Sequence, residues 1–274
     1  MSAATGLAGL RRYTPFAVGS LQTMLRYRST FFVNALTATT AVSLQVFLWR
    51  AVYNGDSGSG PGGFDRAGIT TYVLLAQVLG LLHANRVDEE VSGEIQRGDI
   101  AVSLIRPVSY PLTRFCAGVP VSLVNAGLVG GPVVLLYAGL LPLQRPGAGD
   151  ALLFTASSLL AMVIAFEVNL LVGLAGFATT NIWGIRIVKD CLVALLAGQV
   201  VPISLMPGPL AATARLLPFA GLVDSPLRLL LGEYQGPAEA AEILAGQAAW
   251  TAGMSLLTAL AWRRAVRRVE VLGG

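Results

Sequence analysis

Charged side chains are scarce in this sequence. They make up 12% of the 274 residues, whereas an ordinary soluble domain has roughly 25%, and the mean hydropathy is high at +0.67. The chain also has a single histidine, a single lysine and two cysteines, Cys116 and Cys191. These numbers exclude a histidine cluster, a disulfide framework and a cysteine-rich metal site. We therefore expect no metal site, and we do not expect a soluble enzyme.

Catalytic motifs are also missing. The phosphate-binding pattern G-x-x-x-x-G-K-[ST] is absent, because the single lysine, Lys189, follows Gly184-Ile185-Arg186-Ile187-Val188. No G-x-S-x-G or H-E-x-x-H pattern occurs. Glu89-Glu90 could begin the E-E-x-x-x-R motif of glutamate intramembrane proteases, but Glu94 stands at the arginine position. We expect no catalytic residue and no cofactor bound by this chain.

Long uncharged runs are what the sequence has in abundance. Each approaches or exceeds the ~20 residues that a helix needs to cross ~30 Å of hydrocarbon, if the run interrupted by Glu167 is counted as one. Backbone groups in lipid must be paired within their own segment, so these runs should be helices. The sequence thus predicts an all-α membrane protein with six transmembrane helices. We place them at Phe31–Tyr53, Ile69–Ala84, Val119–Leu141, Leu152–Phe177, Ile187–Leu205 and Ile243–Trp262.

The cationic residues predict the orientation of these spans. Fourteen of the 19 fall on the side of the two termini, and five fall on the other side. Loops rich in Lys and Arg stay in the cytoplasm, so both termini should be cytoplasmic, in a multi-pass protein of the plasma membrane. The five on the external side are Arg50, Arg66, Arg145, Arg215 and Arg228.

Three segments outside the spans have patterns of their own. The cytoplasmic N-terminus, residues 1–28, contains an amphipathic stretch over 14–28 that predicts an interfacial helix, although a plain extension of the first span is the alternative. The external connection 206–242 is apolar but interrupted by Pro218, so it should form short helices that re-enter the outer leaflet.

The second cytoplasmic segment, residues 86–117, is the most informative. Its first part, residues 86–99, contains five acidic residues and two arginines, and Val87, Val91 and Ile95 form an apolar stripe at helical spacing. Gly98 is a natural helix stop. The stripe must rest on the ends of the chain's own spans or on a partner, because so small a helix cannot fold alone. A solvated loop helix is the alternative.

A few polar and small residues fall within or beside the spans. An ionised carboxylate such as Glu167 is costly at the middle of a span, so it either faces a translocation path or is a protonated group bonded to Asn169, Thr180 or the backbone. Lys189 and Asp190 are interpreted as residues that snorkel to the membrane surface. Gly127-x-x-x-Gly131 predicts a close helix contact.

Taken together, these features resemble the ABC-2 type permeases, which are the membrane subunits of ATP-binding cassette exporters. Gly93-Glu94-Ile95 followed by Leu104-Ile105-Arg106-Pro107-Val108-Ser109 is similar to the "G-E-I, then L-x-R-P-x-S/N" segment of a small six-span subfamily. Leu217-Pro218-Phe219 through Pro226 to Leu231-Gly232 is similar to the same subfamily's "L-P-F … P … L-L-x-G" segment.

The resemblance implies a single transmembrane permease domain over residues 1–274. It further implies a complex of two permease copies, or of two similar permeases, with separate ATPase subunits that bind ATP and Mg²⁺. The helix after the second span would then be a coupling helix that docks on the ATPase. On this sequence the coupling residues would be Glu89, Glu90, Glu94, Arg97 and Asp99. The alternative is a secondary transporter, which needs no ATPase, and a membrane enzyme or a membrane-assembly factor is a third possibility.

Overall fold

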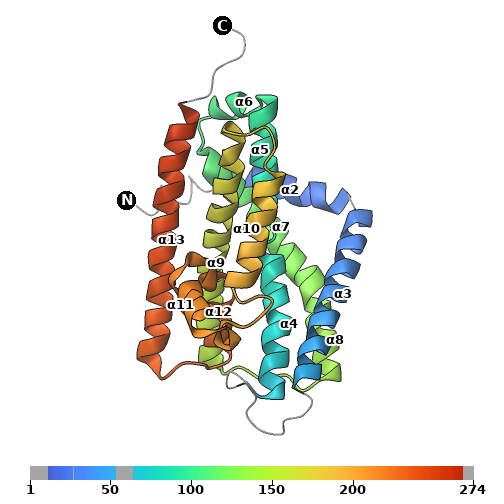
Figure 1. Ribbon diagram of the computed structural model, residues 1–274. Helices are drawn as coiled ribbons and strands as arrows, with labels where there is room; N and C mark the ends of the chain where they lie inside the picture. The colour runs from blue at the N-terminus through green and yellow to red at the C-terminus, as the bar shows by residue number, and fades with distance from the viewer. Residues whose placement is uncertain (1–11, 27, 54–63, 268–274) are drawn as a thin grey trace, which may run out of the picture.

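The structure is a computed structural model that describes residues 12–26, 28–53 and 64–267. Within these residues every regular element is a helix, and most helices run along one common axis (Figure 1). Five helical stretches are long and apolar enough to cross a membrane. This confirms the prediction of an all-α membrane protein. The five stretches contain α3 (Arg28–Val52), α4 (Arg66–His83), α7 with η2 and α8 (Tyr110–Leu140), α9 (Ala148–Leu174) and α13 (Pro237–Val266).

The fifth predicted span differs from its prediction. Helix α10 (Trp183–Leu196) has 14 residues, which is about 21 Å at 1.5 Å per residue and shorter than the ~30 Å of hydrocarbon. Gly198 adopts a φ of 82°, a left-handed conformation that favours glycine, and the chain turns into the short helix η4 (Ile203–Leu205). The continuous helix predicted over Ile187–Leu205 is therefore wrong beyond Leu196.

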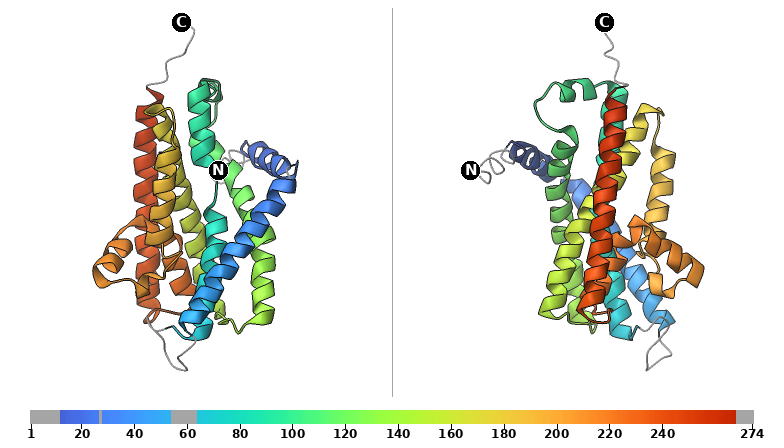
Figure 2. Two further views of the ribbon diagram at one scale, coloured as in Figure 1. Left: turned by 45° about the vertical axis from the view of Figure 1, so that its right-hand side comes forward. Right: turned by 90° about the vertical axis from the view of Figure 1, so that its left-hand side faces the viewer.

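Helix α9 lies at the centre of the bundle, with α13 on one side and α4 on the other (Figure 2). Several of its apolar side chains, among them Ile164 and Leu170, are fully buried. The main buried cluster joins α9 to α4 through Tyr72 and Leu74, and to α12 (Asp224–Leu230) through Leu227. The core therefore forms where these three helices meet.

Helix α7 (Tyr110–Asn125) continues into α8 (Gly131–Leu140) through a π-helical turn, η2 (Ala126–Gly130). A Cβ atom on Gly130 would lie 2.9 Å from a methyl carbon of Val78, so this glycine lets η2 approach α4 closely. Gly127 and Gly131 have no such neighbour. The close approach that Gly127-x-x-x-Gly131 would permit is thus not made within the described residues, and Gly130 makes a close contact with α4 instead.

Short helices fill the connection between α10 and α13. They are α11 (Gly208–Leu216), η5 (Pro218–Leu222) and α12. Helices η5 and α12 fold back against α9 and α13, whereas α11 packs on η4 and η5 and projects outward (Figure 2). Gln247 on α13 fixes them: its Nε2 donates to the carbonyl oxygens of Gly221 (2.7 Å) and Ser157 (2.8 Å), and its Oε1 accepts from the Ser157 hydroxyl (2.7 Å). The predicted break in this segment is confirmed.

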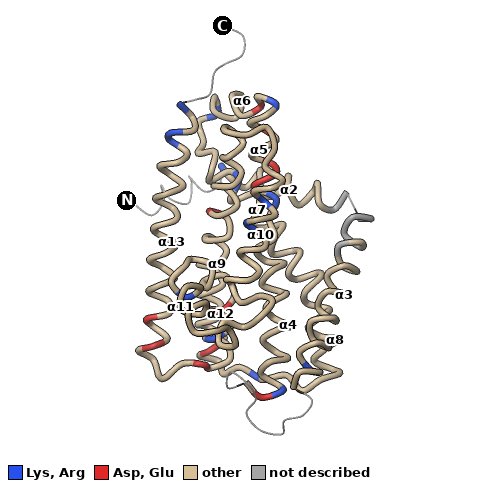
Figure 3. Tube along the Cα trace, in the orientation of Figure 1, with Lys and Arg blue, Asp and Glu red and all other residues tan. Residues whose placement is uncertain are grey.

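The two ends of the bundle differ in charge and shape (Figure 3). One end, called here the α5 end, carries α2 (Thr14–Arg26), α5 (Val87–Arg97) and α6 (Ile100–Leu104). The opposite end, called the α12 end, carries α11 and α12. Helix α2 lies across the bundle and packs on α7, where the Ser20 hydroxyl donates to the Ala117 carbonyl (2.8 Å). The predicted N-terminal helix is thus a separate element, not an extension of α3.

Candidate functional site

Helix α5 stands on the end of α9. The stripe of Val87, Val91 and Ile95 packs against α9, as the first alternative for this helix predicted. The approach is close because two glycines of the α9 end leave no side chain between the helices. A Cβ on Gly173 would lie 2.9 Å from the Cβ of Val91, and one on Gly176 would lie 2.9 Å from the hydroxyl oxygen of Ser92. Gly98 ends α5 with a φ of 77°, as predicted.

A buried polar cluster fixes the base of α5. Asp88 is 1% exposed, and its Oδ2 accepts a hydrogen bond from Lys189 Nζ at 2.8 Å. Lys189 also donates to Asn169 Oδ1 (2.5 Å), and Asn169 Nδ2 donates to Asn85 Oδ1 (3.0 Å). A buried charge is stable only when it is paired and hydrogen-bonded. This cluster therefore locks α5, α9 and α10 together.

The glutamates of α5 are engaged inside the chain. Glu89 pairs with Arg86 (2.6 Å) and with Arg186 on α10. Arg114 on α7 pairs with Glu90 (3.2 Å) and with Glu94. Three carboxylates that sequence reasoning assigned to a partner are thus already in contact with neighbouring helices, and they position α5.

Tyr110 extends this network to α13. Its hydroxyl donates to Glu94 Oε2 (2.6 Å), and its ring stacks on Trp262 of α13 with 4.9 Å between the centroids. The Arg114 guanidinium lies 5.2 Å from the same ring, a favourable cation–π geometry. Helix α5 is therefore connected to α7, α9, α10 and α13, so a movement of α5 acts on most of the bundle.

The far end of α5 and the helix α6 form an exposed tip, defined here as residues 96–107. Arg97 and Asp99 pair with each other (2.8 Å) and face solvent. Val102 is 61% exposed and Ile105 is 83% exposed, although both are apolar. Charged and apolar groups together at the end of a well-supported helix are typical of a surface that contacts another protein.

Of the predicted coupling residues, Arg97 and Asp99 lie at this exposed tip, whereas Glu89, Glu90 and Glu94 lie along the supported part of α5. Sequence reasoning missed the central role of Lys189. The sequence pattern predicts a snorkelling residue, but the Lys189 side chain is 12% exposed and is bonded to Asp88. One sequence feature could have indicated this ion pair: Lys189 is the single lysine, and it lies opposite an acidic helix.

Glu167 lies between α9 and α13. It is 8% exposed, and its Oε1 accepts a hydrogen bond from the Ser255 hydroxyl at 3.0 Å. Of the partners predicted for it, Asn169 bonds to Lys189 and Asn85 instead, and Thr180 is exposed. The donor to Glu167 comes from a helix that is distant in sequence, so local spacing could not indicate it.

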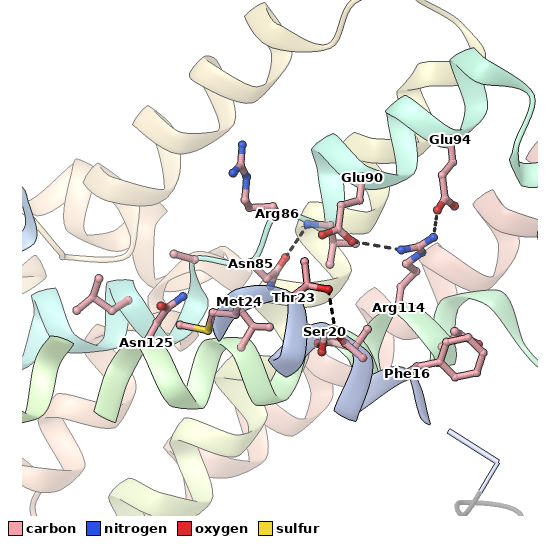
Figure 4. Close-up of a pocket in the computed structure, with 18 of the residues that line it drawn as sticks. Phe16, Ser20, Thr23, Met24, Asn85, Arg86, Glu90, Glu94, Arg114 and Asn125 are labelled. Atoms are coloured by element: carbon pink, nitrogen blue, oxygen red, sulfur yellow. Dashed lines mark hydrogen bonds and ion pairs between the residues drawn. The ribbon is translucent and has the colours of Figure 1, made fainter. Parts of the chain in front are cut away.

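A cavity of about 1200 Å³ opens beside α5 (Figure 4). Helices α2, α3, α4, α5 and α7 contribute its walls, and Arg114 with its partners Glu90 and Glu94 lies on one side. Glu167 is not among its lining residues. The predicted place of Glu167 on a translocation path therefore finds no support from this cavity.

Comparison with known proteins gives one match. Residues 39–273 match the protein family described as ABC-2 family transporter protein. No curated protein and no solved structure matches the chain. The family match covers most of the first spanning stretch, the other four, the α5 and α6 helices and the short helices of the α12 end. The chain therefore belongs to the ABC-2 family of membrane transporter proteins.

Proposed function

We propose that this chain is the membrane subunit of an ATP-driven exporter. It contributes the translocation path and docks on a separate ATPase subunit, which binds ATP and Mg²⁺ and hydrolyses the nucleotide. Family membership supports a transport role in general. The observation that carries the coupling to an ATPase is the exposed tip, where Val102 and Ile105 face solvent at the end of a helix that is tied to four others.

The proposal divides the predicted coupling residues into two groups. Arg97 and Asp99 contact the ATPase together with the apolar side chains of the tip. Glu89, Glu90 and Glu94 are positioning residues, because their ion pairs with Arg186 and Arg114 pass a movement of the tip to α10 and α7. A docking helix needs both a contact surface and a stiff connection to the bundle.

Two further features belong to this proposal. The α5 end faces the cytoplasm, because the cationic side chains are concentrated there, and the protein lies in the plasma membrane. The functional complex holds two permease chains, either two copies or two similar chains. The exposed apolar side chains of α3, such as Leu36 (70%) and Leu44 (66%), are available to lipid or to such a second chain.

Ile105→Glu tests the docking surface. The variant should lose the ATPase during co-purification in mild detergent and should lose ATP-dependent export. Leu216→Glu is the matched control, because Leu216 is 75% exposed but lies at the α12 end. Both variants are compared at equal membrane abundance and equal melting temperature.

Retention of the ATPase by Ile105→Glu would show that the tip is not the docking surface. Transport by the purified chain in vesicles without any ATPase would contradict the exporter proposal and would support a secondary transporter.

A further inference from the structure

The cavity beside α5 changes character along its length. Charged side chains, among them Arg106, Glu90 and Glu94, line the part at the α5 end, whereas Ala38, Leu81 and other apolar groups line the deeper part. The lining follows α7 and η2 from Thr113 to Val129, which is about 24 Å at 1.5 Å per residue. This length exceeds the ~15 Å of hydrocarbon in one leaflet, which is half of ~30 Å.

The size of the cavity also sets limits on what occupies it. Pockets for drug-sized molecules usually have volumes of roughly 300–1,000 Å³, so about 1200 Å³ accommodates a larger molecule. A polar mouth above an apolar depth matches a molecule that has a polar head and an apolar chain. Figure 4 shows Arg114 of α7 near Phe16 and Ser20 of α2 among the residues that line the cavity.

The arginines at the mouth of the cavity differ in whether they have an ion-pair partner. Arg114 of α7 is engaged by Glu90 and Glu94 of α5, and Arg86 by Glu89. Arg106 also lines the cavity, but it has no ion pair in the described part of the chain. It is exposed, so an incoming group can reach it.

The α2 side of the mouth adds no acidic group. The hydroxyl of Tyr13 accepts a hydrogen bond from the backbone N–H of Ser109 at 3.2 Å, so the start of this segment contacts the loop that contains Arg106. The first acidic residue of the sequence is Asp56, so residues 12–26 contain none. Arg106 is therefore available to an acidic group at the mouth of the cavity.

We propose that this cavity binds an anionic amphiphile from the adjoining leaflet, which is the cytoplasmic one if the proposed orientation is correct. The acidic head lies near Arg106, and the apolar chain of the amphiphile follows Ala38, Leu81 and Val121 into the bundle. Helix α2 lies across the bundle at the same level, so the mouth of the cavity borders the region where lipid heads are found.

The preference for an anionic head group is tested by titrating lipid into the purified protein in detergent and measuring the bound lipid by native mass spectrometry. Dioleoyl phosphatidylglycerol should bind several-fold more tightly than dioleoyl phosphatidylcholine. Arg106→Gln should weaken phosphatidylglycerol binding about fivefold, which is the contribution expected for one cation near an anionic head. Arg215→Gln is the control, because Arg215 is also exposed but lies at the α12 end. Equal binding of the two lipids, or an unchanged affinity in Arg106→Gln, would overturn the assignment.

The position of the apolar lipid chain is tested by a substitution that fills the cavity. Ala38→Phe places a ring among the lining residues and should reduce lipid occupancy at least threefold, whereas Leu36→Phe, on the outer face of the same helix, should leave it unchanged. Unchanged occupancy in Ala38→Phe would place the lipid elsewhere. Should that variant unfold, the Arg106 comparison still decides the proposal. Binding is measured without ATPase or nucleotide, so its failure is separate from a failure of the exporter proposal.

Discussion

Asp88 on α5 and Lys189 on α10 form an ion pair of 2.8 Å inside the protein, although they lie 101 residues apart in the sequence. Asp88 is almost completely buried, and Lys189 is shared with Asn169 on α9. The pair therefore forms the junction at which the tip-bearing helix joins the bundle.

Lys189→Met should destabilise the protein strongly. It leaves the Asp88 carboxylate buried without its nearest cation, and removal of one partner from a buried pair costs about 3–5 kcal/mol. The melting temperature in detergent measures this loss, with Arg264→Met as the control at an exposed position of α13. The double variant Asp88→Asn with Lys189→Met should recover part of the stability. No recovery would show that the loss does not come from the unpaired carboxylate.

Gly173→Ala should displace α5 from α9. The added Cβ would lie 2.9 Å from the Cβ of Val91 and 3.2 Å from the backbone of Asp88, and neither can move without shifting the helix. We expect a lower melting temperature and faster hydrogen exchange in 87–97. Gly139→Ala is the matched control, because Gly139 has no atom near its Cβ position and alanine favours a helix. Equal behaviour of the two variants would contradict the tight packing of α5 on α9.

Gln247→Leu should release the folded-back helices of the α12 end. The leucine fills much of the space, but the carbonyl of Gly221 and the hydroxyl of Ser157 lose their partner, at a cost of about 1–3 kcal/mol for each buried group left unsatisfied. Limited proteolysis should cut within 218–230 sooner than in the native protein. Gln235→Leu alters an exposed side chain and should not change the digestion. Protection equal to the native protein would show that Gln247 does not hold this region.

The α12 end should be more stable at acidic pH. Burial is the main cause that raises the pKa of Asp224 from 3.8 to about 6 and that of Glu233 from 4.5 to about 7, while Arg228 opposes both shifts. A raised folded-state pKa means that the folded protein holds the proton more tightly than the unfolded chain. The contribution of these two groups to stability is therefore fully present below about pH 4 and is lost as the pH rises to about 7.

Hydrogen exchange of residues 224–236 at pH 5 and pH 8, corrected for the intrinsic exchange rate, measures this dependence. Asp224→Asn should reduce the difference between the two conditions. Equal protection of residues 224–236 at both pH values in the native protein would contradict the raised pKa values of Asp224 and Glu233.

The proposed orientation is tested by single cysteines at two exposed positions. In a background without Cys116 and Cys191, Gln96→Cys at the tip should react with an impermeant maleimide only after the membrane is opened. Gln235→Cys at the α12 end should react in intact cells. The reverse pattern would invert the orientation.

Much of this fold could be predicted because long apolar runs leave few alternatives in a membrane. The stripe of Val87, Val91 and Ile95 and the stop at Gly98 placed α5 within a few residues. The end of α10 at Leu196 could not be predicted, because the apolar run continues and the break depends on contacts with α4. The same reason applies to Lys189 and Glu167, whose partners Asp88 and Ser255 are brought near only by tertiary packing.

The turn after α10 has a consequence for how the chain is assembled. Its backbone leaves the helix deep in the bundle, and earlier segments supply the missing hydrogen bonds: the Tyr72 hydroxyl donates to the Gly198 carbonyl (3.0 Å) and the Trp49 indole to that of Val200 (3.3 Å). The backbone N–H of Asp224 donates to the Ala197 carbonyl (3.1 Å). Unpaired backbone groups are not tolerated in lipid, so this turn becomes stable only after α3 and α4 are in place. Synthesis from the N-terminus provides that order, and a circularly permuted chain that began at α9 would not.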